Sequence, residues 1–228
     1  AYASMLAAVY QSLAQLRGKL AELGLAGNTI IVFTSDNGGL ATLKNIGPTC
    51  NSPLRAGKGW LYEGGISAPL LIHAPGVTRA GTVSDVPLIS CDFYPTLLEL
   101  AGLLLRPQQH LDGDSFAGLL RGGAAPAARP LFWHYPHYHG STWTPGAAIR
   151  DGDWKLIEFY DYGKAELYNL KDDPGEKNDL AKSEPAQQQA LLDKLHGWQK
   201  SVNAQMPVPD TGAGDEPSRP KKKKRRQP

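Results

Sequence analysis

Apolar residues near the start of the chain recur at alternating steps of three and four. They are Leu6, Val9, Leu13, Leu16, Leu20 and Leu23. This spacing lines one face of an α-helix, and Gly24 is a typical C-terminal cap. The next apolar run, residues 28–33, has little polar alternation, which predicts a strand buried on both faces. A helix, a short turn and a buried strand together predict an α/β fold with a mainly parallel sheet.

A second strand is expected at residues 68–75, where the sequence reads APLLIHAP. Residues 39–67, between the two strands, are rich in glycine and proline. They predict a long irregular loop, and such loops within a compact domain are usually functional or disordered. A helix should follow near residues 90–101, with Ser90 or Asp92 as its N-cap.

The pattern changes after the segment RGGAAPAARP, residues 121–130, which we interpret as a linker. Short aromatic and β-branched runs broken by Asp-Gly and Tyr-Gly then predict antiparallel hairpins. Apolar spacing predicts a closing helix over residues 183–203. We therefore divide the chain into a first domain, 1–128, a small antiparallel-sheet-plus-helix subdomain, 129–205, and a disordered basic tail, 206–228.

Charge is unevenly distributed along the chain. The 228 residues carry a formal net charge of +2, but the segment from Asp210 onward holds seven Lys or Arg against three Asp or Glu. The rest of the chain has a net charge of −2, so it has no electrostatic reason to bind nucleic acid. We interpret the KKKKRR run as an incidental part of the tail, although such runs also bind polyanions or act as targeting signals.

Targeting and redox signals are sparse. No apolar run approaches the roughly 18 residues of a membrane span. The chain starts at Ala1 inside a predicted helix and shows no signal peptide, which leaves export open. The two cysteines, Cys50 and Cys91, imply no disulfide framework and leave the redox compartment open.

An acid and an amide, Asp36 and Asn37, directly follow the first predicted strand and precede two glycines. In open α/β sheets, ligands bind outside the carboxyl ends of the strands. Carboxylate and amide oxygens suit Ca²⁺ or Mg²⁺, but two oxygens are too few to hold an ion, so further ligands must come from elsewhere. The alternative is that both residues simply form a turn.

Lys58 lies between Gly57 and Gly59 in the long loop. Bare backbone on both sides would let its ammonium group approach an anion closely. The surrounding residues do not match a nucleotide-binding P-loop. A solvated loop lysine is the alternative.

Four ordered stretches resemble the sulfatase family of the alkaline-phosphatase-like superfamily. They are TIIVFTSDNGG, LRAGKGWLYEGGISAPLLIHAPG, DFYPTLLELAG and LDGDSFAGLL, and the ending AIRDGDWKLIEFYDYGKAELYNLKDDPGEKNDLA is similar as well. The resemblance covers residues 1–203. It implies that the first domain is part of an alkaline-phosphatase-like, mainly parallel sheet with helices, and that the protein is a sulfuric ester hydrolase.

The resemblance also implies roles for single residues. Asp36 and Asn37 stand where the family has two ligands of its catalytic calcium, and Lys58 stands where the family has a lysine that contacts a sulfate oxygen. The family's nucleophile is a formylglycine hydrate made from a C/S-x-P-x-R motif. Members mostly work in the periplasm, outside the cell or in lysosomes, so we expect a periplasmic or extracellular location.

The chain departs from the family at the nucleophile. CNSPLR places Cys50 three residues before its proline, one too many for C/S-x-P-x-R, and lies downstream of the metal pair, whereas the family's motif lies far upstream. The family's other two metal aspartates are also absent. We interpret the chain as the C-terminal half of a sulfatase whose upstream half supplies them. Alone, it should fold marginally and show no turnover.

Weaker candidates cluster in the subdomain. His134, His137 and His139 lie among aromatic residues, and with Arg150 they predict a sugar or aryl subsite. The alternative is an aromatic strand packed against the helix, and the histidine spacing matches no standard zinc site. We expect Glu166 to be solvated.

Two other functions stay open. A phosphomonoesterase or phosphonate hydrolase of the same superfamily would use a related site. A non-catalytic module could bind a sulfated glycan without hydrolysing it. The partner expected in each sulfate-directed case is a sulfated small molecule or glycan.

Overall fold

The computed structural model describes residues 2–42 and 49–208 of the chain. The predicted basic tail from residue 209 onward lies outside the described residues. In chain order the elements are α1 (Tyr2–Glu22), η1 (Ala26–Asn28), β1 (Ile31–Thr34), α2 (Glu63–Ile66), β2 (Leu70–His73), η2 (Ser90–Asp92), α3 (Phe93–Leu100), α4 (Ala117–Leu120), β3 (Leu131–Tyr135), β4 (Gly146–Asp151), β5 (Trp154–Phe159), η3 (Tyr160–Tyr162), β6 (Lys164–Asn169) and α5 (Pro185–Ser201).

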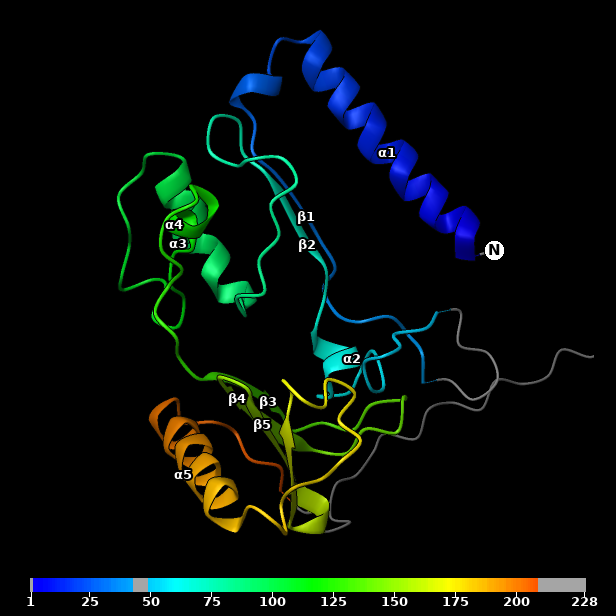
Figure 1. Cartoon of the computed structure of the whole chain (residues 1–228), viewed down its shortest axis with the longest axis vertical. Helices are drawn as coiled ribbons and strands as arrows, with labels where there is room; N and C mark the ends of the chain where they lie inside the picture. Colours follow the sequence, from blue (N-terminus) through cyan, green and yellow to red (C-terminus); the bar gives the residue numbers. More distant parts are fainter. Residues whose placement is uncertain (1, 43–48, 209–228) are drawn as a thin grey trace, which may run out of the picture.

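The C-terminal sheet is antiparallel, with strand order β3-β4-β5-β6, and it confirms the predicted hairpins. Side chains alternate between its two faces, as the period of two requires. On one face, Ile149, Leu156 and Leu167 pack with Leu191 and Leu195 of α5. This confirms the predicted closing helix. Figure 1 shows α5 lying along that face of the sheet.

The opposite face of the same sheet is covered by the loop that precedes α2. Ala148, Ile157 and Tyr168 on this face form a buried cluster with Leu61 and Tyr62 of the loop. The loop that carries Lys58 therefore belongs to the core of the C-terminal sheet. Because both faces of the sheet are covered, the apolar residues of β4 and β5 are almost fully buried.

The first strands differ from the prediction. β1 and β2 pair antiparallel, with Ile31 opposite His73 and Thr34 opposite Leu70, so within residues 2–42 and 49–128 the expected mainly parallel sheet is not formed. β2 therefore runs back along β1 in the opposite direction. Helix α2 lies between the two strands in the sequence, but its four residues are too few for the crossover helix that a parallel pair needs.

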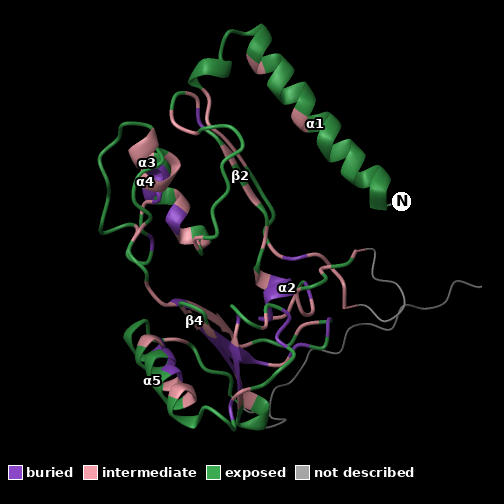
Figure 2. Cartoon of the chain, viewed as in Figure 1, coloured by how far each residue is buried: buried purple, intermediate pink, exposed green. Residues whose placement is uncertain are grey.

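The expected burial of the first strand on both faces is also wrong. Phe33 of β1 is 37% exposed and Leu71 of β2 is 59% exposed. Helix α1 forms as predicted but contains no buried residue, and Figure 2 shows it exposed along nearly its whole length. No described helix is long and apolar enough to cross a membrane.

The predicted helix after the long loops is confirmed as η2 and α3. Asp92, which is fully buried, accepts hydrogen bonds from the backbone N–H groups of Ile89 and Asp114 at 3.0 and 2.9 Å. Its carboxylate also pairs with Arg129 at 2.5 Å. The end of the predicted linker is thus tied to the start of this helix. The division into domains at residue 128 stays a prediction.

Candidate functional site

The turn at residues 36–39 lies directly against the loop that carries Lys58. The backbone N–H of Gly38 donates to the carbonyl oxygen of Gly65 at 2.9 Å, and that of Lys58 donates to the carbonyl oxygen of Gly39 at 3.1 Å. A Cβ on Gly38 would lie 1.8 Å from a neighbouring carbonyl oxygen, so this approach requires glycine. The structure therefore brings the glycines that follow the predicted metal pair against the loop of the predicted sulfate-binding lysine.

A single amide side chain fastens this arrangement. Asn51 Nδ2 lies 2.8 Å from the carbonyl oxygen of Gly39, 3.0 Å from that of Ala56 and 3.1 Å from that of Gly64. The carbonyl oxygen of Gly39 also accepts from backbone N–H groups, but those of Ala56 and Gly64 would lose this donor in a crowded loop, which is costly. This role could not be predicted from the sequence, because the three acceptors are backbone atoms scattered along the chain.

The predicted ligand residues are accessible. Asp36 and Lys58 are exposed and Asn37 is half-buried. Within the described residues, no group of three or more His, Cys, Asp and Glu side chains is arranged to hold a metal ion. Ca²⁺ takes about six to eight oxygen ligands. Asp36 and Asn37 are hard oxygen donors on a fixed turn, so they fit part of a calcium site that other residues must complete.

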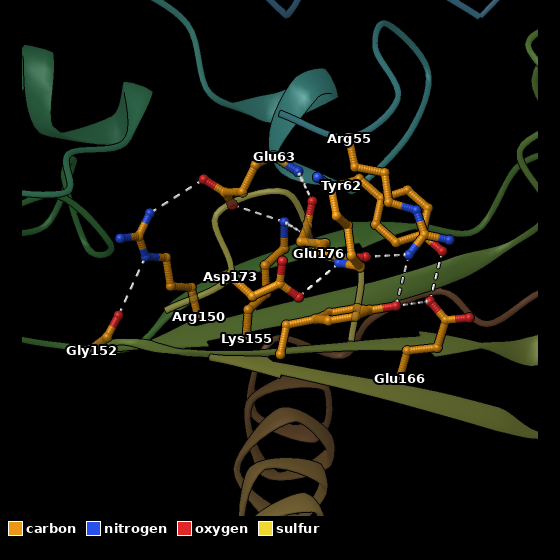
Figure 3. A network of polar contacts seen from close by, with 11 residues as sticks. Arg55, Tyr62, Glu63, Arg150, Gly152, Lys155, Glu166, Asp173 and Glu176 are labelled. Atoms are coloured by element: carbon orange, nitrogen blue, oxygen red, sulfur yellow. Dashed lines mark hydrogen bonds and ion pairs between the residues drawn. The ribbon is translucent and has the colours of Figure 1, made fainter. Parts of the chain in front are cut away.

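Arg55 holds the Lys58 loop on the C-terminal sheet. Its guanidinium lies 3.8 Å from the centroid of the Tyr62 ring, a favourable cation–π arrangement. Its Nη1 donates to the hydroxyl oxygen of Tyr168 at 2.9 Å and to the carbonyl oxygen of Glu176 at 2.7 Å (Figure 3). The arginine of the near-miss CNSPLR motif therefore has a structural role.

A buried ion cluster joins the same loop to β5. Lys155 Nζ, which is fully buried, lies 2.8 Å from Glu63 Oε1 and 2.8 Å from Glu176 Oε1 (Figure 3). Glu176 Oε2 also accepts a hydrogen bond of 2.7 Å from the backbone N–H of Glu63. Burial raises the pKa of Glu176, although Lys155 and this N–H act against the rise. The cluster thus fixes the start of α2 against the sheet.

Glu166 is buried, so the expectation that it is solvated is wrong. It accepts hydrogen bonds from the hydroxyls of Tyr62 and Tyr168 at 2.6 and 2.7 Å, and it pairs with Lys164 at 2.7 Å. Burial alone would raise the pKa of Glu166, but these donors together hold it below its ordinary value. Burial raises the pKa values of both tyrosines, and the bonds to Glu166 add to this rise.

The structure separates the candidate histidines. His134 uses both ring nitrogens within the chain, with Tyr160 Oη and the carbonyl oxygen of Gln205 each at 2.9 Å. His137 is exposed. His139 lies against the lysine loop, since a Cβ on Gly59 would be 2.1 Å from its Nδ1. Of the three histidines, His139 is therefore the one that the fold places beside Lys58.

Arg150 and the cysteines are also placed. Arg150 Nη1 lies 3.4 Å from Glu63 Oε2, so its charge is already partly used by the buried cluster. A substrate anion would have to compete with this carboxylate. Cys50 is exposed, and both it and Cys91 are free thiols.

Comparisons with known proteins show which family the chain resembles. The family model described as "N-sulphoglucosamine sulphohydrolase, C-terminal" matches residues 56–204, and the model described as "Sulfatase" matches residues 1–103. A sulfatase of Formosa agariphila is 40% identical over 196 residues, covering 79% of this chain and 34% of the relative. Human arylsulfatase A is 33% identical over 183 residues, covering 71% of this chain and 35% of the relative.

Solved structures are similar as well. Ps i-CgsB in complex with k-i-k-neocarrahexaose has a TM-score of 0.75 and 32% identity, covering 91% of this chain and 44% of that one. A protein in complex with its substrate D-glucosamine-2-N,6-O-disulfate has a TM-score of 0.70 and 29% identity, covering 87% and 39%. The chain spans about a third of the length of the curated relatives it matches, from 34% to 35% of the two named above.

Proposed function

The chain belongs to the sulfatase family, and from this premise we propose that it forms part of a sulfuric ester hydrolase that acts on a sulfated glycan. The observation that carries the proposal is the direct hydrogen bonding between the turn at residues 36–39 and the loop of Lys58. That contact supports a site in which oxygen donors and a cation meet, as a sulfate ester and a divalent cation require.

Each residue has a distinct role in this proposal. Asp36 and Asn37 donate oxygens to a calcium ion, with magnesium as the alternative, and when bound that ion would polarise the sulfate ester. Lys58 directs its ammonium group at a sulfate oxygen and stabilises the negative charge that develops in the transition state. The backbone contacts of Asn51 and Gly38 hold these groups in place before substrate arrives.

The nucleophile lies outside this chain in our proposal. Cys50 is exposed, but CNSPLR lacks the family's spacing. We propose that an upstream half of the same protein supplies the formylglycine and the remaining calcium ligands. The 228 residues alone should therefore show no turnover, and the complete protein should work in the periplasm or outside the cell, as its family does.

A glycan is favoured over a simple aryl sulfate as substrate. Two solved relatives are described in complex with a neocarrahexaose and with a disulfated glucosamine, and the matching C-terminal family model is that of a sulphoglucosamine hydrolase. An aryl alcohol is the second candidate, supported by the likeness to arylsulfatase A.

The test uses the chain joined to its upstream region, with release of sulfate as the readout. Lys58→Ala should lower kcat by about 10²–10³, because it removes a group aimed at developing charge. Lys171→Ala, at an exposed position outside the site, is the matched control and should keep full activity. Equal activity of the two variants would contradict the proposed role of Lys58.

The same preparation separates the alternatives. Faster cleavage of phosphate or phosphonate esters than of sulfate esters would indicate the phosphomonoesterase or phosphonate hydrolase. Calcium-dependent binding of a sulfated sugar without any release of sulfate, measured by calorimetry on the joined protein, would indicate a binding module.

A further inference from the structure

Beside the Lys58 loop, the C-terminal sheet carries a pocket of about 180 Å³ with a largely aromatic wall. Its lining includes the side chains of Trp60, Tyr62, Phe159, Tyr162, Lys164 and Glu166. Two hydroxyl side chains, Thr142 and Thr144, complete it. None of the roles proposed above for calcium or sulfate uses these residues.

The inner wall of the pocket is rigid. The rings of Trp60 and Tyr62 stack with centroids 5.6 Å apart, and Trp60 also meets Trp143 edge-on at 5.7 Å. Trp60 Nε1 donates to the carbonyl oxygen of Ser141 at 2.9 Å, and the hydroxyl of Tyr62 donates to Glu166 at 2.6 Å. A wall held in this way loses little conformational freedom when a ligand binds.

The rim of the pocket is polar and accessible. Tyr162 is 68% exposed, and Lys164, whose side chain is 54% exposed, lies 2.7 Å from Glu166. One positive and one negative side chain leave the lining with no net charge, which disfavours a second sulfate group here. The threonine hydroxyls add neutral donors and acceptors.

We propose that this pocket binds an unsulfated sugar ring of a glycan, next to the sulfated unit that lies at Lys58. A sugar ring presents C–H groups on its faces, which pack on aromatic rings, and hydroxyls at its edge, which bind carboxylate, ammonium and hydroxyl groups. This inference adds a second binding site to the proposed function. Only the position of the sulfated unit at Lys58 rests on that proposed function.

The position of the pocket supports this pairing of sites. Trp60 follows Lys58 by two residues on a turn that is closed by a hydrogen bond of 3.0 Å from Trp60 N–H to the carbonyl oxygen of Gly57. Two residues span at most about 7 Å. Neighbouring units of one glycan can therefore reach the lysine and the pocket together.

The first experiment measures binding of unsulfated disaccharides of galactose and of glucosamine to the chain joined to its upstream region, by saturation-transfer NMR. We expect binding that Tyr162→Ala weakens about tenfold, because a stacking partner is lost. Tyr138→Ala is the matched control, since Tyr138 is equally exposed at 71% but lies outside the pocket lining. The Tyr138→Ala variant should bind the disaccharides with the same affinity as the unchanged chain.

The outcomes distinguish this inference from the proposed function. If the folded chain binds none of the disaccharides, or if both tyrosine variants bind equally well, the pocket proposal is overturned. In the protein joined to its upstream region, Tyr162→Ala should raise KM for a sulfated oligosaccharide and leave that for an aryl sulfate unchanged. If the joined protein binds the sugar but releases no sulfate, the proposed hydrolase function is overturned and the pocket proposal is supported.

Discussion

Replacing Lys155 by alanine tests whether the buried ion cluster holds the Lys58 loop on the C-terminal sheet. The change removes the cation that lies 2.8 Å from both Glu63 and Glu176. Glu63 keeps Arg150 at 3.4 Å, but Glu176, with a fully buried side chain, loses its cation. Removing one partner of a buried ion pair typically costs about 3–5 kcal/mol. Because Arg150 compensates in part, we expect the lower end, about 3 kcal/mol.

The assay is urea denaturation followed by tryptophan fluorescence. All five tryptophans of the chain lie between residues 60 and 198, so the signal reports on the C-terminal sheet and its covering loop. Lys194→Ala is the control, because the side chains of Lys194 and its partner Asp151 are 53% and 29% exposed and exposed ion pairs contribute about 0–1 kcal/mol. The double variant Lys155→Met with Glu176→Gln should recover most of the loss, since no buried charge is then left without its partner.

Two results would refute this reasoning. If Lys155→Ala and Lys194→Ala destabilise the chain equally, the buried cluster contributes no more than a surface pair. If the double variant is as unstable as Lys155→Ala, the unpaired charge of Glu176 does not explain the loss. Hydrogen exchange should agree, with faster exchange at residues 57–65 in Lys155→Ala.

Three further predictions concern other parts of the chain. Gly38→Ala should displace the turn at its close backbone contact and destabilise the chain by about 1–3 kcal/mol, whereas Gly18→Ala, with nothing within 4 Å, should only raise helix content measured by circular dichroism. Leu16→Glu should lower self-association in sedimentation experiments, because Leu16 is 52% exposed on the apolar stripe of α1; unchanged sedimentation would contradict this. The pKa of Glu166 is lowered in the folded state, so its stabilisation is present above the unfolded value of about 4.3 and is lost as pH falls through the folded value. Glu166→Gln should therefore cost about 1.5–3 kcal/mol at pH 7 and less in acid, while the exposed Glu184→Gln should cost little at any pH.

Local patterns predicted the elements well and their partners less well. The closing helix, the hairpins, the first helix and the helix at η2–α3 form where periodicity and capping residues placed them. The α/β class is confirmed by the solved sulfatases that the chain resembles. The direction of β2 relative to β1 was missed, because strand direction depends on where the connecting loop runs and not on the strand's own composition.

The candidate site shows the same division. The roles of Asp36, Asn37 and Lys58 stay predictions, and the sequence singles these residues out because polar residues beside glycines mark constrained turns. The structural roles of Asn51 and Glu176 were missed, because an amide or a carboxylate in a loop is expected to be solvated unless its backbone partners are known. Glu166 was misjudged for a related reason: in an alternating strand it reads as a solvent-facing residue, but Tyr62 of a distant loop covers it.

The contacts of Arg55, Glu63 and Tyr62 give the C-terminal sheet a role in the geometry of the site. These three residues lie within nine positions of the sequence around Lys58, and their partners lie on β5, on β6 and in the loop that follows β6. The turn at residues 36–39 is also hydrogen-bonded to the Lys58 loop. The separation between the turn at residues 36–39 and the Lys58 loop is therefore set by contacts within this chain. Changes in the buried charges of the sheet should consequently alter the position of Lys58 without touching it.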